Sequence, residues 1–161
     1  SRNVEATNVL RSVGKTEALL TLLGDILKGT AAVAIGKLLG VSSSVEGALA
    51  VSAVAGHDFS IFLRFRGGKG VATSIGVMLI YAPKAGILTI LLWLATVALT
   101  KYSSLGALVS FGLLPIVCYL LGYGWDVLAV TVILTILLFF KHSGNILRLL
   151  KGRERRIGQR A

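Results

Sequence analysis

The sequence contains a single cysteine, Cys118, which lies inside an apolar segment. It therefore cannot form an intrachain disulfide or a cysteine-based zinc site. Charged residues are also scarce: they make up 15% of the 161 residues, while 55% are hydrophobic. An ordinary soluble domain is about a quarter charged. The composition predicts an all-α, polytopic integral membrane bundle that forms one domain over residues 1–161.

Acidic residues are far fewer than basic ones, 7 against 17, and the formal net charge is +10. In a soluble protein this excess would indicate a nucleic-acid partner. Here the basic residues lie in the connections between apolar segments, where membrane topology accounts for them. No aromatic residues alternate with a basic stripe, as single-strand binding requires, so we expect no nucleic-acid partner. Because the sequence also lacks a His-Glu-x-x-His motif and a carboxylate cluster, we expect no metal.

Five apolar stretches follow one another along the chain: residues 17–39, 41–56, 71–100, 105–122 and 126–140. The third is too long for one crossing, because a helix of its 30 residues would measure about 45 Å against a hydrocarbon core of roughly 30 Å. Pro83 and Lys84 divide it, which gives six crossings. If the chain starts on the inside of the membrane, Lys37 and Lys84 are the only basic residues of the connecting segments that lie outside. Asp25 and Lys28 interrupt the first stretch, and we expect them to pair within the membrane.

The glycine-rich turn Gly67-Gly68-Lys69-Gly70 follows the second stretch and carries the sharpest chemical signal. Glycines let a backbone approach a ligand closely, and their N–H groups can point at an anion. Since Lys69 adds a positive charge, the turn suits a phosphate or an acyl phosphate. It is not a nucleotide-binding P-loop, because Gly70 stands where that motif needs Ser or Thr. An ordinary turn with positive-inside charges is the alternative interpretation.

Two further polar clusters fall on the same side of the membrane as this turn in the six-crossing topology. They span residues 1–11 and 141–154. Their Ser, Thr and Asn side chains can form hydrogen bonds, and their basic residues can bind phosphate. His142 and Asn145 are three residues apart, so they share a face if the tail is helical. Together these clusters could hold a phosphorylated substrate beside a lipid chain.

Each polar group also has a simpler explanation. Ser1 and Asn3 could cap a helix, and Arg11 could be a positive-inside charge. His142 could be a helix-end residue near the lipid headgroups. Glu154 stands among three arginines and could form a surface ion pair with them.

Three motifs stand in order along the chain: Ser1-Arg2-Asn3-Val4-Glu5-Ala6-Thr7-Asn8 followed by Arg11; Gly56 through Thr73; and His142, Asn145, Ile146, Arg148, Leu149, Gly152 and Glu154. Together they resemble the PlsY family, the bacterial membrane acyl-phosphate:glycerol-3-phosphate acyltransferases. The resemblance covers the whole chain, and the second motif is the most specific. Two departures stand out. Glu5 occupies a position where the family usually has glycine, and the family has seven membrane helices, so the resemblance implies that this chain lacks the first transmembrane helix.

The resemblance implies transfer of a fatty acyl group from acyl phosphate to the 1-hydroxyl of glycerol 3-phosphate. The product is lysophosphatidic acid, in the first step of phospholipid synthesis. No cofactor is expected, because a mixed anhydride is already activated. The implied partners are acyl phosphate, glycerol 3-phosphate and the lipid bilayer. The implied setting is a monomer in the bacterial inner (plasma) membrane, with the active face toward the cytoplasm.

Site residues follow from the same resemblance. Ser1, Arg11, Lys69 and His142 are implied as catalytic; Gly67, Gly68 and Gly70 as acyl-phosphate ligands; and Asn3, Thr7, Asn8, Asn145 and Glu154 as further substrate-binding residues. The proton acceptor is open between His142 and a phosphate oxygen of a substrate, and the second is favoured because the other candidates are cations, amides and hydroxyls.

Two alternative functions remain open from the residues alone. A small anion transporter or channel would need polar groups along a path across the bilayer. An inactive membrane homologue would be consistent with Glu5 and the missing helix.

Overall fold

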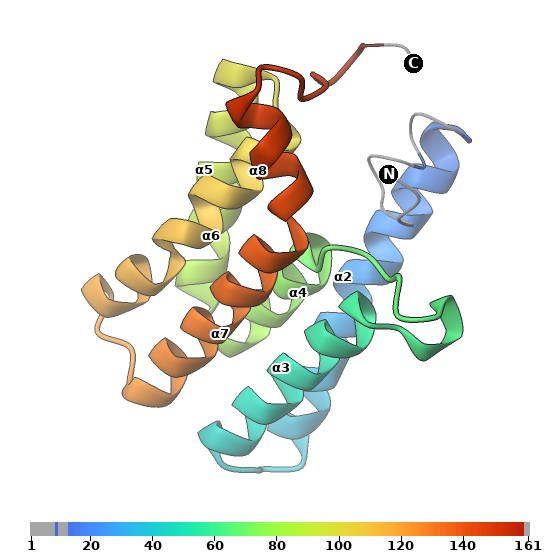
Figure 1. Cartoon of the computed structure of the whole chain (residues 1–161). Helices are drawn as coiled ribbons and strands as arrows, with labels where there is room; N and C mark the ends of the chain where they lie inside the picture. Colours follow the sequence, from blue (N-terminus) through green and yellow to red (C-terminus); the bar gives the residue numbers. More distant parts are fainter. Residues whose placement is uncertain (1–8, 10–12, 160–161) are drawn as a thin grey trace.

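The computed structural model describes residue 9 and residues 13–159, and within these ranges the chain is helical with no strand (Figure 1). In chain order the elements are α2 (Lys15–Leu38), α3 (Ser43–Asp58), the short 3-10 helix η1 (Ile61–Leu63), α4 (Val71–Tyr81), α5 (Pro83–Thr100), α6 (Ser103–Leu120), α7 (Trp125–Lys141) and α8 (Ser143–Leu150). The predicted all-helical fold is confirmed. Helices α2 to α7 correspond closely to the predicted apolar segments, and α8 lies in the predicted basic tail.

The break predicted at Pro83 separates α4 from α5. Helix α4 ends at Tyr81, and Pro83 is the first residue of α5. Proline suits this position because the first turn of a helix leaves its N–H groups without helical partners, so the missing N–H costs nothing. A Cβ at Gly86 would lie 2.8 Å from the carbonyl carbon of Met78. The absence of that side chain therefore lets α5 fold back closely against α4.

Helices α2 and α4 approach each other through two glycines. A side chain at Gly29 would collide with the backbone oxygen of Thr73, and one at Gly76 would collide with the backbone oxygen of Ile26. Small residues at a helix crossing allow this closeness in membrane proteins, where packing rather than water drives association. The contact holds the start of α4, and with it the glycine-rich turn, close to α2.

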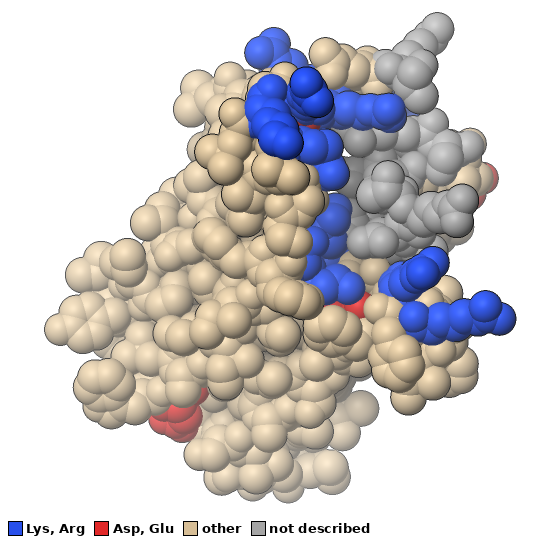
Figure 2. Space-filling view, viewed as in Figure 1, with Lys and Arg blue, Asp and Glu red and all other residues tan. Residues whose placement is uncertain are grey.

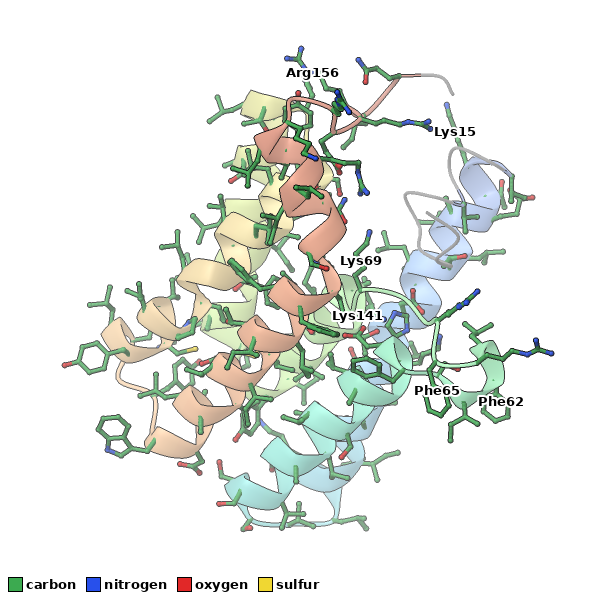
Figure 3. All side chains as sticks on the ribbon, viewed as in Figure 1. Lys15, Phe62, Phe65, Lys69, Lys141 and Arg156 are labelled. Atoms are coloured by element: carbon green, nitrogen blue, oxygen red, sulfur yellow. The ribbon has the colours of Figure 1, made fainter. Side chains whose placement is uncertain are left out.

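The bundle buries a modest apolar core and exposes many large apolar side chains. Met78, Phe111 and Leu114 are fully buried. In contrast, Leu20, Leu27 and Leu99 are among many leucines that are more than half exposed. So many exposed large apolar side chains suit a lipid environment. Around η1, the exposed Phe62 and Phe65 also point away from the bundle (Figure 3).

Three of the described helices, α2, α5 and α6, are long and apolar enough to cross a membrane; α7 and α8 add a fourth if this pair, bent by 61°, is one span. Helices α3 and α4 are shorter, with 16 and 11 residues. The count of six crossings stays a prediction. Lys15 and Arg156 lie at the same end of the molecule, as an even number of crossings requires (Figure 3). At the other end of α2, Lys37 donates a hydrogen bond of 2.7 Å to the Ile80 oxygen.

Candidate active site

The glycine-rich turn connects the η1 region to α4. Its three glycines are buried, and Lys69 is half-buried. Gly70 has φ 73° and directly precedes α4, a left-handed conformation that favours glycine. The turn thus presents Lys69 just before the N-terminus of α4, where unpaired N–H groups and the helix dipole favour an anion. Figure 3 shows Lys69 pointing toward the end of the molecule that carries Lys15 and Arg156.

The glycines of this turn pack against the protein itself. A side chain at Gly67 would collide with the backbone oxygen of His57, and one at Gly68 would collide with the His57 imidazole. The sequence suggested that these glycines leave room for a ligand. The structure supplies another reason, since the turn can rest on the end of α3 only if both positions lack a side chain.

Lys141 connects the end of α7 to the same part of α3. Its ammonium donates a hydrogen bond of 2.6 Å to the Asp58 backbone oxygen. It also lies 4.8 Å from the centroid of the Phe59 ring, within the range of a cation–π interaction. These contacts bring the third motif, which begins at the end of α7, next to the second motif.

His142 lies between α7 and α8, where the chain bends, and only 3% of it is exposed. His142 thus stands at a helix end, as the simpler interpretation has it, but its side chain is buried within the protein. Its Nδ1 atom lies 2.9 Å from the Leu138 backbone oxygen. Because a carbonyl oxygen only accepts, Nδ1 carries a hydrogen, which leaves Nε2 as the acceptor of the neutral ring. The Lys69 ammonium is close enough to act electrostatically on this imidazole.

Glu154 holds the C-terminal segment against α6 and α8. One carboxylate oxygen accepts hydrogen bonds from Ser104 Oγ at 2.8 Å and Asn145 Nδ2 at 2.6 Å, and the other accepts one from Arg148 Nε at 2.7 Å. The Glu154 side chain is only 9% exposed. The expected surface ion pair with the neighbouring arginines is wrong, because the ionic partner is Arg148 and the carboxylate is largely buried.

The hydrogen bonds to Glu154 predict a pH dependence of stability. Burial alone would raise the pKa of Glu154, but the bonds from Asn145, Ser104 and Arg148 outweigh it and lower the pKa from its usual 4.5. A lowered folded-state pKa contributes stability that is present above the unfolded value and is lost as the pH falls through the folded value. We therefore expect the difference in melting temperature between the native protein and Glu154→Gln, measured in detergent, to be constant near neutral pH and to shrink below pH 4.5. A difference that stays constant down to pH 3 would contradict this expectation.

Basic side chains gather at the end of the molecule that carries the C-terminal tail. Figure 2 shows Lys and Arg over this tail and along the visible face down to the middle of the molecule, whereas the described residues of the lower part of this face show none. This matches the charge asymmetry expected from the sequence.

The structure adds residues that the sequence did not single out for the site. The predicted pair of Asp25 and Lys28 is confirmed, with 2.8 Å between Lys28 Nζ and Asp25 Oδ1. His57 Nδ1 also lies 3.5 Å from that oxygen. Ser104, which bonds Glu154, stands in the sequence only as part of the short interval between the apolar stretches 71–100 and 105–122. Nothing local in the sequence connects Asp25 with His57 or Ser104 with Glu154, because each of these two pairs is distant along the chain.

The residues of the first motif lie outside the described part of the chain, namely Ser1, Asn3, Glu5, Thr7, Asn8 and Arg11. Their predicted roles stay predictions. In the part that the structure describes, no group of three or more His, Cys, Asp or Glu side chains could hold a metal ion.

Fold and site together define a helical integral membrane protein in which a buried glycine-rich turn carries Lys69 and packs against the end of α3. The profile of the glycerol-3-phosphate acyltransferase family matches residues 1–152, and the chain belongs to this family. It is therefore an acyltransferase of phospholipid synthesis, and the transporter alternative falls away. The resemblance recognised from the three motifs is confirmed.

Individual relatives support the same assignment. The chain is 43% identical over 158 residues to the glycerol-3-phosphate acyltransferase of Methylococcus capsulatus, a match that covers 98% of this chain and 80% of the relative. It is 48% identical over 160 residues to the enzyme of the same name from Sinorhizobium fredii, with coverages of 99% and 77%.

Two solved structures have the same fold. Both are of PlsY (YgiH), described as an integral membrane glycerol 3-phosphate acyltransferase, one in its glycerol 3-phosphate form and one in its lysophosphatidic acid form. The TM-scores are 0.92 and 0.90, each at 36% sequence identity; the matches cover 98% and 97% of this chain and 80% of each PlsY chain.

Proposed function

We propose that this protein transfers a fatty acyl group from acyl phosphate to the 1-hydroxyl of glycerol 3-phosphate and releases lysophosphatidic acid and inorganic phosphate. The observation that carries the proposal is the charge of Lys69 on a glycine-rich turn, at a helix N-terminus and within electrostatic range of the buried His142. Such a place suits a phosphate group. The exposed apolar surface of the bundle suits the acyl chain.

The reaction needs little covalent chemistry from the protein. The 1-hydroxyl oxygen attacks the acyl carbonyl carbon, the bond from that carbon to the phosphate oxygen breaks, and phosphate leaves with the electron pair. The hydroxyl proton goes to a phosphate oxygen of a substrate, or to Nε2 of His142, the acceptor of the neutral ring. We favour the substrate oxygen, with the protein supplying position and positive charge.

Each site residue has a proposed role. Lys69 and His142 bind the phosphate and hydroxyl groups of glycerol 3-phosphate, together with Ser1, Arg11 and Asn145. The turn glycines Gly67, Gly68 and Gly70 bind the acyl phosphate. Asn3, Thr7 and Asn8 add polar contacts to the substrates. Glu154 acts in this site through Asn145, whose side-chain amide it holds at 2.6 Å. The protein works as a monomer in the bacterial inner membrane, with this site on the cytoplasmic side.

A donor comparison tests the proposal. The full chain, purified in detergent, is given glycerol 3-phosphate with either a long-chain acyl phosphate or the matching acyl-CoA. We expect lysophosphatidic acid and inorganic phosphate in equal amounts from acyl phosphate, and no product from acyl-CoA. Glycerol as the acceptor is the control, and it should react poorly because it lacks the phosphate that Lys69 binds. Product formation from acyl-CoA alone would overturn the proposed donor.

A further inference from the structure

The buried Asp25 carboxylate and the buried His57 imidazole lie next to the glycine-rich turn. Asp25 on α2 and His57 on α3 line a pocket of about 470 Å³, together with Lys28, Phe62 and Gly68. The side chains of Asp25 and His57 are each only 9% exposed, although Asp25 lies within an apolar helix. Ionisable groups at such positions are costly and usually have a function. The reaction proposed above uses neither residue.

The three groups form a chain of contacts from α2 to the turn. The Asp25 Oδ1 atom lies 3.5 Å from Nδ1 of His57. On the other edge of the ring, Nε2 is the atom that a side chain at Gly68 would strike first. The imidazole thus lies between the Asp25 carboxylate and the Gly68 backbone.

We infer that Asp25 and His57 are positioning residues for the phosphate-binding turn, an inference that rests on the function proposed above. Asp25 orients the His57 imidazole, and the imidazole packs against the Gly68 backbone and holds it in place. Lys69, the next residue, is thereby held in the direction of His142. A phosphate site gains from this support because a turn that is already in place does not have to be ordered when the substrate binds.

The two adjacent glycines provide a matched pair for testing the inference. An added Cβ at Gly68 would strike the His57 ring, whereas one at Gly67 would strike the His57 backbone oxygen. Truncation of His57 to alanine removes the ring but leaves the backbone oxygen. It should therefore relieve the strain of Gly68→Ala and leave that of Gly67→Ala unchanged.

The experiment is a pair of double-mutant cycles in the full chain, with kcat and KM measured for each substrate. We expect His57→Ala alone to raise the KM for acyl phosphate severalfold with a smaller change in kcat. Gly68→Ala should raise that KM about tenfold in the native background and less than about twofold in the His57→Ala background. Gly67→Ala should raise it by the same factor in both. Equal effects of Gly68→Ala in the two backgrounds would overturn the inference.

Melting temperature in detergent gives the same cycles a readout that needs no activity. The fall in melting temperature caused by Gly68→Ala should be smaller in the His57→Ala background than in the native background. The fall caused by Gly67→Ala should be the same in both backgrounds. If the native enzyme is active with acyl phosphate but the effects of the glycine and His57 substitutions are additive, this inference alone is contradicted. If the native protein does not use acyl phosphate, both the proposed function and the inference are contradicted.

The contribution of Asp25 is tested against its other partner. Lys28 also pairs with Asp25, but its side chain is 61% exposed. If Asp25 acts through His57, Asp25→Asn should raise the KM for acyl phosphate as His57→Ala does and add little to that variant, while Lys28→Met changes it less than about twofold. An effect of Lys28→Met as large as that of Asp25→Asn would show that the ion pair, rather than the imidazole contact, matters.

Discussion

Replacement of Lys69 by alanine is expected to lower turnover of acyl phosphate and glycerol 3-phosphate by about 10- to 100-fold while the protein stays folded. A lost charge-assisted contact to phosphate is worth roughly 1.5–3 kcal/mol, which corresponds to this range in rate. Lys69 is half-buried on a turn whose glycines are buried, so its charge is held in place rather than displayed on a mobile surface side chain. The measurement is kcat and kcat/KM in detergent, together with the melting temperature of each variant.

Arg66→Ala is the matched control for this prediction. Arg66 carries the same charge three residues earlier, but it is exposed and precedes the buried part of the turn. If the site needs a charge at one place, Arg66→Ala should leave turnover within about twofold of the native value, since exposed charges contribute little. Equal losses in the two variants would indicate a general effect of positive charge. Normal turnover in a folded Lys69→Ala protein would contradict the assignment of Lys69 to the site.

Replacement of Glu154 by alanine is expected to impair both stability and activity. The change removes one carboxylate and leaves Ser104, Asn145 and Arg148 without their shared acceptor. Hydrogen bonds to a charged group are worth more than neutral ones, and we expect the free energy of unfolding to fall by about 2–4 kcal/mol. Because Asn145 loses the partner that orients it, turnover should fall by more than about tenfold even at temperatures where the variant stays folded.

Two further variants separate these effects. Arg155→Ala, next to Glu154 and exposed, should change stability by less than about 0.5 kcal/mol. Ser104→Ala removes one of the three donors and should cost about 1 kcal/mol with little loss of turnover, since Asn145 and Arg148 still bond the carboxylate. If Glu154→Ala lowers stability but leaves turnover at the native value below its melting temperature, Glu154 holds the tail without positioning the site.

The sequence predicted the helices because the signals that set them are local. Apolar runs of membrane-spanning length specify helices in lipid, where the backbone must bond within its own segment. Pro83 divided the longest run, as its fixed φ and missing N–H require, and the structure begins α5 at that residue. The second and third motifs were recognisable for the same reason, since each is a continuous stretch of chain. Crossing number was less predictable, because α3 and α4 are shorter than a regular span.

The partners of the polar residues were decided only by the tertiary structure. Glu154 stands beside arginines in the sequence but bonds Arg148, Asn145 and Ser104, because the tail folds back onto α6 and α8. In the sequence, Gly67 and Gly68 suggested room for a ligand. In the structure, the lack of side chains at these positions also lets His57, at the end of α3, pack against the turn. Asp25, predicted to pair with Lys28, also lies close to the His57 imidazole. Composition and local pattern fix which segments are helical and which are polar. Contacts between residues far apart in the chain depend on how helices cross, and these crossings are set by the fit of side chains that no single segment contains.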